Sequence, residues 1–282
     1  MEKILIAGAS GTAGRTITEM LVNNENYAVY GLTHKQENLS LLRELGCIPV
    51  LVNLTDREQS LDAIQRIQPK VIVSSVMGVG EQPSKQEFHM NKNLIEISRE
   101  TGVATFVYIS VFQSEINTGV PHFEVKGKIE QLLKSSGINY IVIRPATFMD
   151  GLFMPWILQS VREQNTLVSP MEIGTKISYI HTLDIAELVL YALQQKIFNE
   201  IYTIGGRSLS ISDIQKTLAE KTKTEIRYQK LPREQVRQMA GKNIALMVDY
   251  FNKNGFEVPE NTLPKDYKPQ LRDFENEINQ HL

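Results

Sequence analysis

Short apolar runs rich in β-branched residues alternate with amphipathic segments along the first half of the chain. The runs occupy Ile4–Ala7, Ala28–Leu32, Ile48–Val52, Val71–Val73, Thr105–Ile109 and Tyr140–Ile143. Between them, Thr12–Val22 and Asp56–Ile67 repeat apolar residues at the three- and four-residue spacing of a helix face. Strands that alternate with helices through short connections form parallel sheets, and strands without polar alternation are covered on both faces. The pattern therefore predicts a doubly wound parallel α/β sheet.

The pattern loosens after Arg144-Pro145. Met149–Ser178 contains the only tryptophan, two prolines and no clear period, which favours an excursion that forms a pocket. Later elements are expected at Asp184–Leu193 (helix), Ile201–Ile204 (strand) and Ser210–Leu218 (helix). We expect residues 1–150 with 176–205 to form the sheet domain. Residues 151–175 with 206–282 are expected to form a smaller C-terminal α+β lobe that binds substrate.

Composition and charge narrow the function. The 282 residues carry a formal net charge of −2, which gives no general attraction to nucleic acid or to an anionic membrane. Cys47 is the only cysteine, and the histidines show no metal-ligand spacing, so neither a disulfide nor a metal site is expected. Gly8 and Ser10 interrupt the first apolar stretch, and no run approaches the ~20 apolar residues of a membrane span. We expect a cytoplasmic protein.

A glycine-rich turn, G-A-S-G-T-A-G-R, follows the first expected strand at residues 8–15. Gly8 would make the tight turn, Gly11 would let a pyrophosphate approach the backbone, and Gly14 would let helix and strand pack closely. Free N–H groups and the positive dipole end at a helix N-terminus attract phosphate. Strand, turn and helix in this order favour a dinucleotide-binding Rossmann site over a plain glycine turn. The cofactor contacts expected here are Gly8, Ser10, Gly11, Thr12, Ala13, Gly14 and Arg15.

The G-x-x-G-x-x-G spacing resembles the short-chain dehydrogenase/reductase superfamily, and other stretches agree with it. Val107–Val111 is similar to that superfamily's fifth strand, which ends in a serine, and Pro121–Glu130 to the helix with its catalytic lysine. The stretches S-G-I-N-Y-I-V-I-R-P-A-T-F-M and I-S-Y-I-H-T-L-D-I-A-E resemble its extended or atypical members. Over Lys3 to Leu231 the chain resembles the NmrA-like branch. That branch includes NAD(P)H:quinone reductase-type enzymes, relatives of isoflavone reductases and non-catalytic NADP-responsive regulators.

The end of the second expected strand bears on the choice of cofactor. In NAD-specific proteins an acidic residue there binds the ribose 2′-OH, whereas this chain reads L-T-H-K. We expect Thr33, His34 and Lys35 to surround a 2′-phosphate; for Lys35 taken alone, a solvated loop cation is the alternative. Arg15 adds a planar donor fork that suits phosphate, so NADPH is expected to bind better than NADH. Further cofactor contacts are expected at Asn53 and Leu54 (adenine), Ser74, Ser75 and Val76 (nicotinamide ribose), Lys126 and Pro145.

The resemblance implies that the reaction centres on Lys126 and the residue four positions before it. In the superfamily that residue is a tyrosine, and the lysine binds the nicotinamide ribose and lowers the tyrosine's pKa. Here the position holds His122. A histidine titrates near pH ~6.5 and can donate a proton itself, although a nearby lysine cation disfavours its charged form. Helix capping is an equal alternative for His122, and Ser110 either binds an acceptor oxygen or ends its strand.

A quinone is a less demanding acceptor than a simple carbonyl, because it takes hydride readily and water can protonate the product oxygen. The protein must mainly place the acceptor against the cofactor. Candidates for the apolar pocket are Phe112, Phe148, Met149, Phe153 and Trp156, although such residues are more often core. The sequence favours an NAD(P)H-dependent oxidoreductase acting on a small quinone-like or conjugated carbonyl acceptor. The alternative is a non-catalytic NADP(H)-binding redox sensor with a protein partner, for which the basic segment 221–242 is a candidate docking site; a homodimer is a further candidate.

Overall fold

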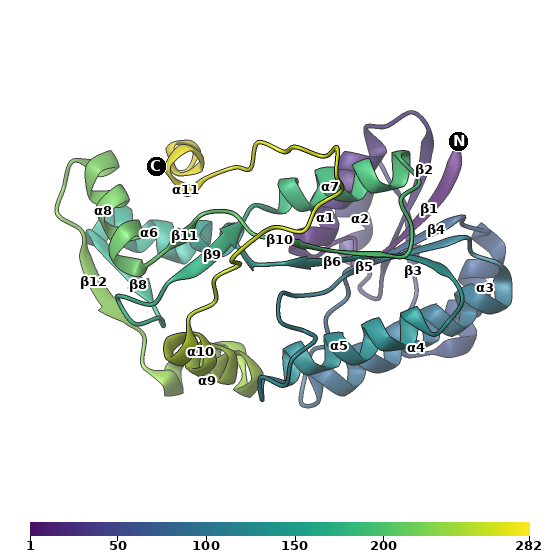
Figure 1. Cartoon of the computed structure of the whole chain (residues 1–282), viewed down its shortest axis with the longest axis horizontal. Coiled ribbons are helices and arrows are strands. Elements are labelled where there is room, and N and C mark those ends of the chain that lie inside the picture. The colour runs from purple at the N-terminus through teal and green to yellow at the C-terminus, as the bar shows by residue number, and fades with distance from the viewer.

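The computed structural model describes residues 1–282 and has a seven-stranded sheet at the centre of its larger part (Figure 1). The strands are β1 Glu2–Ala7, β2 Tyr27–Thr33, β3 Ile48–Leu51, β4 Val71–Ser74, β5 Thr105–Ile109, β6 Asn139–Pro145 and β10 Glu200–Ile204. Their order in space is β10-β6-β5-β4-β1-β2-β3, and all neighbours are parallel. The predicted doubly wound α/β fold is confirmed. The strand order reverses between β1 and β4, where such sheets bind ligands.

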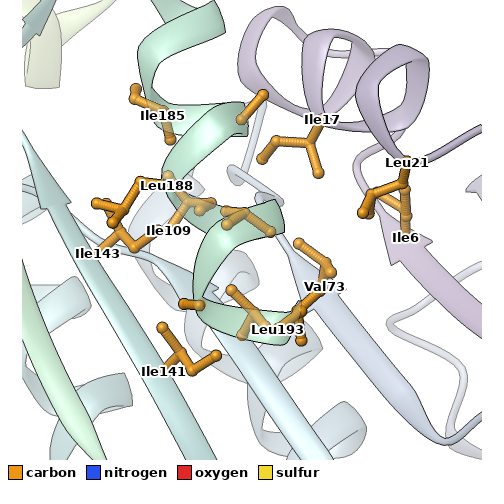
Figure 2. Close-up of a cluster of buried hydrophobic side chains, with 14 of the residues drawn as sticks. Ile6, Ile17, Leu21, Val73, Ile109, Ile141, Ile143, Ile185, Leu188 and Leu193 are labelled. Carbon is orange, nitrogen blue, oxygen red and sulfur yellow. The ribbon is translucent and has the colours of Figure 1, made fainter. Parts of the chain in front are cut away.

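Helices cover both faces of this sheet (Figure 1). One face carries α1 Thr12–Val22, α2 Asn38–Glu44 and α7 Thr182–Gln194, and the other carries α3 Arg57–Ile67, α4 Pro83–Thr101 and α5 Pro121–Lys134. Figure 2 shows Ile17 of α1 and Leu188 of α7 pointing toward the sheet residues Val73 and Ile143. The amphipathic segments expected from the sequence agree with α1 and, within one residue, with α3, which begins after Asp56 because that side chain caps it.

The chain leaves the sheet after β6 and builds the smaller lobe. Its strands are β7 Thr147–Phe148, β8 Thr166–Ser169, β9 Ile177–Ile180, β11 Ser208–Leu209 and β12 Arg227–Lys230. Its α-helices are α6 Pro155–Gln164, α8 Ile211–Thr222, α9 Arg233–Ala240, α10 Lys242–Asn254 and α11 Phe274–Glu277. Two short 3₁₀ helices, η1 Met149–Phe153 and η2 Ile278–Gln280, complete it. Met149–Ser178 is thus more regular than expected. Its apolar side chains, such as Leu158 and Leu167, face a separate core cluster inside this lobe.

The last part of the chain connects the two parts of the molecule. After α10 it crosses back over α7 and then returns to the lobe (yellow in Figure 1). The side chains of Val258, Leu263, Tyr267 and Leu271 pack against the core cluster beneath α7. Arg272 then forms ion pairs with Asp184 (2.5 Å) and Glu187 (2.8 Å) of α7. The division into domains stays a prediction, and this return segment contacts the sheet domain although it falls in the lobe's expected range.

Candidate functional site

A cavity of about 580 Å³ lies at the carboxyl ends of the parallel strands, between the sheet and the smaller lobe. On the side of β2 and β3 it is bordered by Gly8, Ser10, Gly11, Thr12, Ala13, Gly14, Thr33, His34, Asn53 and Leu54. On the side of β5 and β6 it is bordered by Ser75, Val76, Ser110, His122, Lys126, Pro145 and Phe148. The structure therefore brings together most of the residues that the sequence singled out, although they come from distant parts of the chain.

The glycine turn at the start of α1 leaves room for a phosphate. Gly8 has φ +84°, which favours glycine, and a Cβ on Gly14 would lie only 2.0 Å from the Gly8 carbonyl oxygen. At Gly11 a Cβ would meet that oxygen alone, at 3.3 Å. No side chain caps the helix at Gly11, so the amides of its first turn have no partner within the helix and border the cavity. This geometry fits the pyrophosphate of a dinucleotide.

The adenosine side differs from expectation in its charged residues. Lys35 is exposed and does not border the cavity. Arg15 also lies outside its wall and forms a surface ion pair with Glu19 (3.2 Å). The sequence reasoning missed Asn38, whose Nδ2 donates to Ser10 Oγ at 3.1 Å and to Thr33 Oγ1 at 3.4 Å, and so ties the glycine turn to the end of β2. Exposed ion pairs are weak, so Arg15 is free to turn toward a 2′-phosphate.

Ser74 and Ser75, at the end of β4, play different parts. Ser75 borders the cavity, and its hydroxyl donates to the Ala7 carbonyl oxygen at 3.3 Å. Ser74 is fully buried and donates to Asn91 Oδ1 of α4 at 2.6 Å. The expected ribose contact at Ser74 does not arise, because its side chain faces α4 and not the cavity.

Lys126 is held at the cavity wall by partners on two elements. Its Nζ donates to the Ile109 carbonyl oxygen at 3.2 Å, at the end of β5. The same Nζ lies 3.0 Å from Glu87 Oε1 of α4, and the carboxylate side chain is 1% exposed. Glu87 Oε2 lies 3.9 Å from His122 Nδ1. The sequence reasoning did not include Glu87; its only signal there is a helical spacing that places Glu87 in phase with Leu94 on the buried face of α4.

His122 is neutral at physiological pH. Burial, followed by the nearby Lys126 cation, lowers its pKa to about 4, and the opposing effect of Glu87 is smaller. Burial and the charge of Glu87 also raise the pKa of Tyr108, whose ring lies under Lys126. Neither side chain is therefore a ready proton donor near neutral pH.

The Ser110 hydroxyl donates its proton to a buried carboxylate and not into the cavity. Its Oγ donates to Glu130 Oε1 at 2.5 Å, and Ser114 donates to the same oxygen at 2.6 Å. Arg144 binds the Glu130 carboxylate with two N–H groups, at 3.0 and 2.6 Å. Burial would raise the pKa of Glu130, but the hydrogen bonds from Arg144 and the two serines outweigh burial and lower it. Ser110 thus presents only lone pairs to the cavity and does not donate to an acceptor oxygen.

Apart from Phe148, the apolar wall comes from residues other than those expected. Of the five candidates only Phe148 borders the cavity. Phe112 packs edge-on against Phe256, Met149 is buried in the lobe core, Phe153 stacks on Phe274 and His281, and Trp156 is exposed on α6. The wall is formed instead by Met77, Val79, Met90, Ile244, Met247, Phe251 and Phe256, from the loop after β4, α4, α10 and the segment after it. These side chains suit a flat apolar ligand.

Elsewhere the structure adds few candidate sites. No group of three or more His, Cys, Asp or Glu side chains is placed to hold a metal ion. No helix combines the length and apolarity needed to cross a bilayer. In the basic segment 221–242, Lys230 pairs with Glu172 and Arg233 with Asp249, so part of its positive charge is compensated within the lobe.

Comparison with known proteins identifies the family. The model of the NmrA-like family matches residues 1–275. The chain belongs to the NmrA-like family. The NmrA-like chain is 29% identical to the photosystem II assembly factor Ycf39 of Cyanophora paradoxa over 75% of its own length and 66% of that protein. It is 23% identical to the NAD(P)H azoreductase of Xenophilus azovorans over 83% and 79% of the two chains. The chain spans only 60% to 66% of the length of the Ycf39 proteins that it matches.

Solved structures share the fold of this NmrA-like chain. The triphenylmethane reductase of Citrobacter sp. in complex with NADP(H) has a TM-score of 0.79 at 15% identity, covering 99% of this chain and all of that one. The NADPH-dependent quinone oxidoreductase QOR2 of Escherichia coli, in complex with NADPH, has a TM-score of 0.73 at 17% identity, covering 90% and 91%. The resemblance to the NmrA-like branch is confirmed, and the fold is shared with reductases solved in complex with NADP(H) and NADPH.

Proposed function

We propose that the protein is an NADPH-dependent oxidoreductase that reduces a small quinone-like or conjugated carbonyl acceptor. One observation carries the proposal: the glycine turn, Lys126 and an apolar wall of Met and Phe side chains border the same cavity. A cofactor lying from the turn to Lys126 has its reactive end beside that wall. Catalysis then rests mainly on holding the acceptor against the cofactor.

Bound NADPH would supply a hydride, which is one proton with two electrons, and would become NADP+. Lys126 Nζ, held by Ile109 and Glu87, would donate its remaining hydrogen to the nicotinamide ribose, as the family resemblance implies. A quinone that accepts the hydride takes one further proton from water and leaves as the hydroquinone. This acceptor class suits a site in which His122 is neutral and the Ser110 hydroxyl already donates to Glu130. A simple aldehyde, whose alkoxide needs a proton as it forms, is a poorer match.

NADPH is proposed over NADH for reasons at the end of β2. No carboxylate is present at residues 32–35, and Thr33 and His34 border the cavity there. Lys35 lies within this stretch and Arg15 lies in the glycine turn, and both cations are exposed. Two solved neighbours hold NADP(H) or NADPH, which supports this proposal, whereas two others hold NAD+, so the choice rests on the residues at the end of β2.

The test follows NADPH oxidation by absorbance across a panel of quinones and simple aldehydes. We expect turnover with quinones and little with aldehydes. Lys126→Met should lower kcat/KM at least tenfold, whereas Lys128→Met, which removes an exposed lysine from the same helix, should leave it unchanged. Turnover unaffected by Lys126→Met would reject the site, and no turnover with any acceptor would reject the activity.

The alternative is a non-catalytic NADP(H)-binding protein that acts through a partner. It is favoured by the lack of a ready proton donor at His122 and Ser110, and by relatives named as assembly factors. In that case NADPH binds tightly without turnover, and the basic segment 221–242 is the proposed partner site. Cytoplasmic location and a homodimer stay predictions in either case.

A further inference from the structure

The acceptor side of the cavity carries a single ionised group. Among all residues that border the cavity, Lys126 is the only Lys, Arg, Asp or Glu. His122 is neutral, because burial and the Lys126 cation lower its pKa to about 4. The rest of this side is uncharged: it is mostly apolar, with Met90, Phe148 and Phe251, and its other polar side chains include Gln86, Ser110 and Thr147. The charge that an acceptor experiences there is set by Lys126 and by whatever compensates it.

The compensating group is Glu87, which lies behind Lys126. Glu87 is buried and does not border the cavity, so a ligand does not contact it. Its Oε1 forms an ion pair with Lys126 Nζ at 3.0 Å and has no hydrogen-bond partner. The other groups that face this carboxylate, His122 at 3.9 Å and the hydroxyl of Tyr108, are uncharged. Lys126 is therefore the only ionised partner of Glu87.

The second buried acid near the cavity does not disturb this balance. Glu130 is bound by two N–H groups of Arg144 and by the hydroxyls of Ser110 and Ser114. Arg144 also pairs with Glu115, whose side chain is 45% exposed and thus screened by water. Behind the cavity wall, each buried carboxylate is matched by one cation.

We infer that Glu87 keeps the acceptor side electrically neutral and thereby selects uncharged aromatic acceptors over anionic ones of the same shape. This inference rests on the proposed function, because it names the acceptor class of that site. An anion entering the cavity loses water and meets an apolar wall with a cation already neutralised, which is costly. A neutral aromatic ring loses only weakly bound water and gains contact with Met and Phe side chains. Glu87 acts through Lys126, so it is a specificity-determining and positioning residue.

The test measures binding without turnover. Two redox-inert probes of similar size, 2-naphthol (uncharged) and 2-naphthalenesulfonate (anionic), are titrated calorimetrically into the NADPH-loaded protein at neutral pH. We expect the wild type to bind the naphthol at least tenfold more tightly. Glu87→Gln keeps the shape of the side chain but leaves Lys126 uncompensated, and should shift the ratio of the two Kd values about tenfold toward the sulfonate (1.4 kcal/mol). Glu81→Gln changes the net charge by the same amount but at an exposed residue, and should leave the ratio unchanged.

Two results would overturn the inference. One is a wild type that binds the sulfonate as tightly as the naphthol, a measurement that does not depend on any variant. The other is a folded Glu87→Gln protein, verified by its thermal transition, with the wild-type ratio. With quinones, the same substitution should change KM for sulfonated against uncharged acceptors more than kcat. Absence of turnover would reject the proposed function, yet the ratio of Kd values would still report on Glu87.

Discussion

Gly11 and Gly14 belong to one turn, but the structure gives them separable roles. A Cβ on Gly14 would lie 2.0 Å from the Gly8 carbonyl oxygen, 2.7 Å from the Gly8 carbonyl carbon and 2.7 Å from Ser75 Oγ. Two of these neighbours are backbone atoms of the turn, so α1 must move away from β1. A Cβ on Gly11 would meet only the Gly8 oxygen, at 3.3 Å, on a backbone with φ −82° that alanine adopts readily. We therefore compare Gly14→Ala with Gly11→Ala.

The two substitutions should differ in the free energy of unfolding. Forcing one methyl group into a packed contact costs about 1–3 kcal/mol, and the short distances at Gly14 place it at the upper end. For a chain of this size each kcal/mol corresponds to roughly 2–4 °C in Tm, so Gly14→Ala should lower Tm by about 6–12 °C. Gly11→Ala should change the free energy of unfolding by less than ~1 kcal/mol, because replacing glycine lowers the conformational entropy of the unfolded chain and this offsets the mild contact.

Gly11→Ala, which should hardly change the free energy of unfolding, should strongly weaken cofactor binding. Its Cβ would occupy the space that a pyrophosphate needs near the first amides of α1, so we expect NADPH affinity to fall at least tenfold while Tm without cofactor is kept. The assays are thermal unfolding of the free protein and a titration that follows the fluorescence of bound NADPH. Unchanged NADPH affinity in Gly11→Ala, or an unchanged Tm in Gly14→Ala, would refute this interpretation of the turn.

Four further predictions concern residues in or near the cavity. Arg15→Ala combined with Lys35→Ala should weaken NADPH binding about tenfold and leave NADH binding unchanged in fluorescence titrations; equal losses would exclude a 2′-phosphate contact. The pKa of His122 is lowered to about 4, so kcat/KM with a quinone should stay level between about pH 6 and 8, and a histidine-dependent step near pH ~6.5 would contradict it. Because the unfolded state binds this proton more strongly, His122 lowers stability as pH falls from about 6.5 toward 4, by about 3 kcal/mol, and His122→Asn should reduce the acid-induced fall in Tm. Glu130→Gln breaks the paired contact with Arg144 and should cost about 3 kcal/mol of unfolding free energy, measured by denaturant titration.

The sheet could be predicted because its strands depend on local properties of the chain. Runs such as Val71–Val73 and Thr105–Ile109 are apolar throughout and β-branched, as strands covered on both faces require. The glycine turn is equally local, since strand, turn and α1 are consecutive. By contrast, α4 lacks a clear apolar period, because its buried face includes Glu87, Asn91 and Ser98. Those polar residues face partners on other elements, which the local sequence does not reveal.

The acceptor wall could not be predicted for a related reason. Most of the aromatic residues expected there, such as Phe153 and Trp156, follow β6 directly in the chain. In the structure these residues face the C-terminal helix or solvent, while α10 and the loop after β4 cover the cavity. The relevant contacts depend on how the smaller lobe folds back on the sheet. Similarly, the pairing of Lys126 with Glu87 becomes apparent only when α4 and α5 lie side by side.

The apolar wall also bears on the choice between enzyme and sensor. Pyrophosphate and ribose need the glycine turn, the strand ends and Lys126, none of which requires Met or Phe side chains from the smaller lobe. Met77 and Val79 of this wall are 55% and 60% exposed, and apolar surface facing water is unfavourable by about 25 cal/mol per Å². A flat apolar acceptor would cover that surface beside the nicotinamide, whereas a sensor that binds only NADP(H) leaves it exposed. The wall therefore favours catalysis, and the lack of a ready acid then limits the acceptors to those that water can protonate.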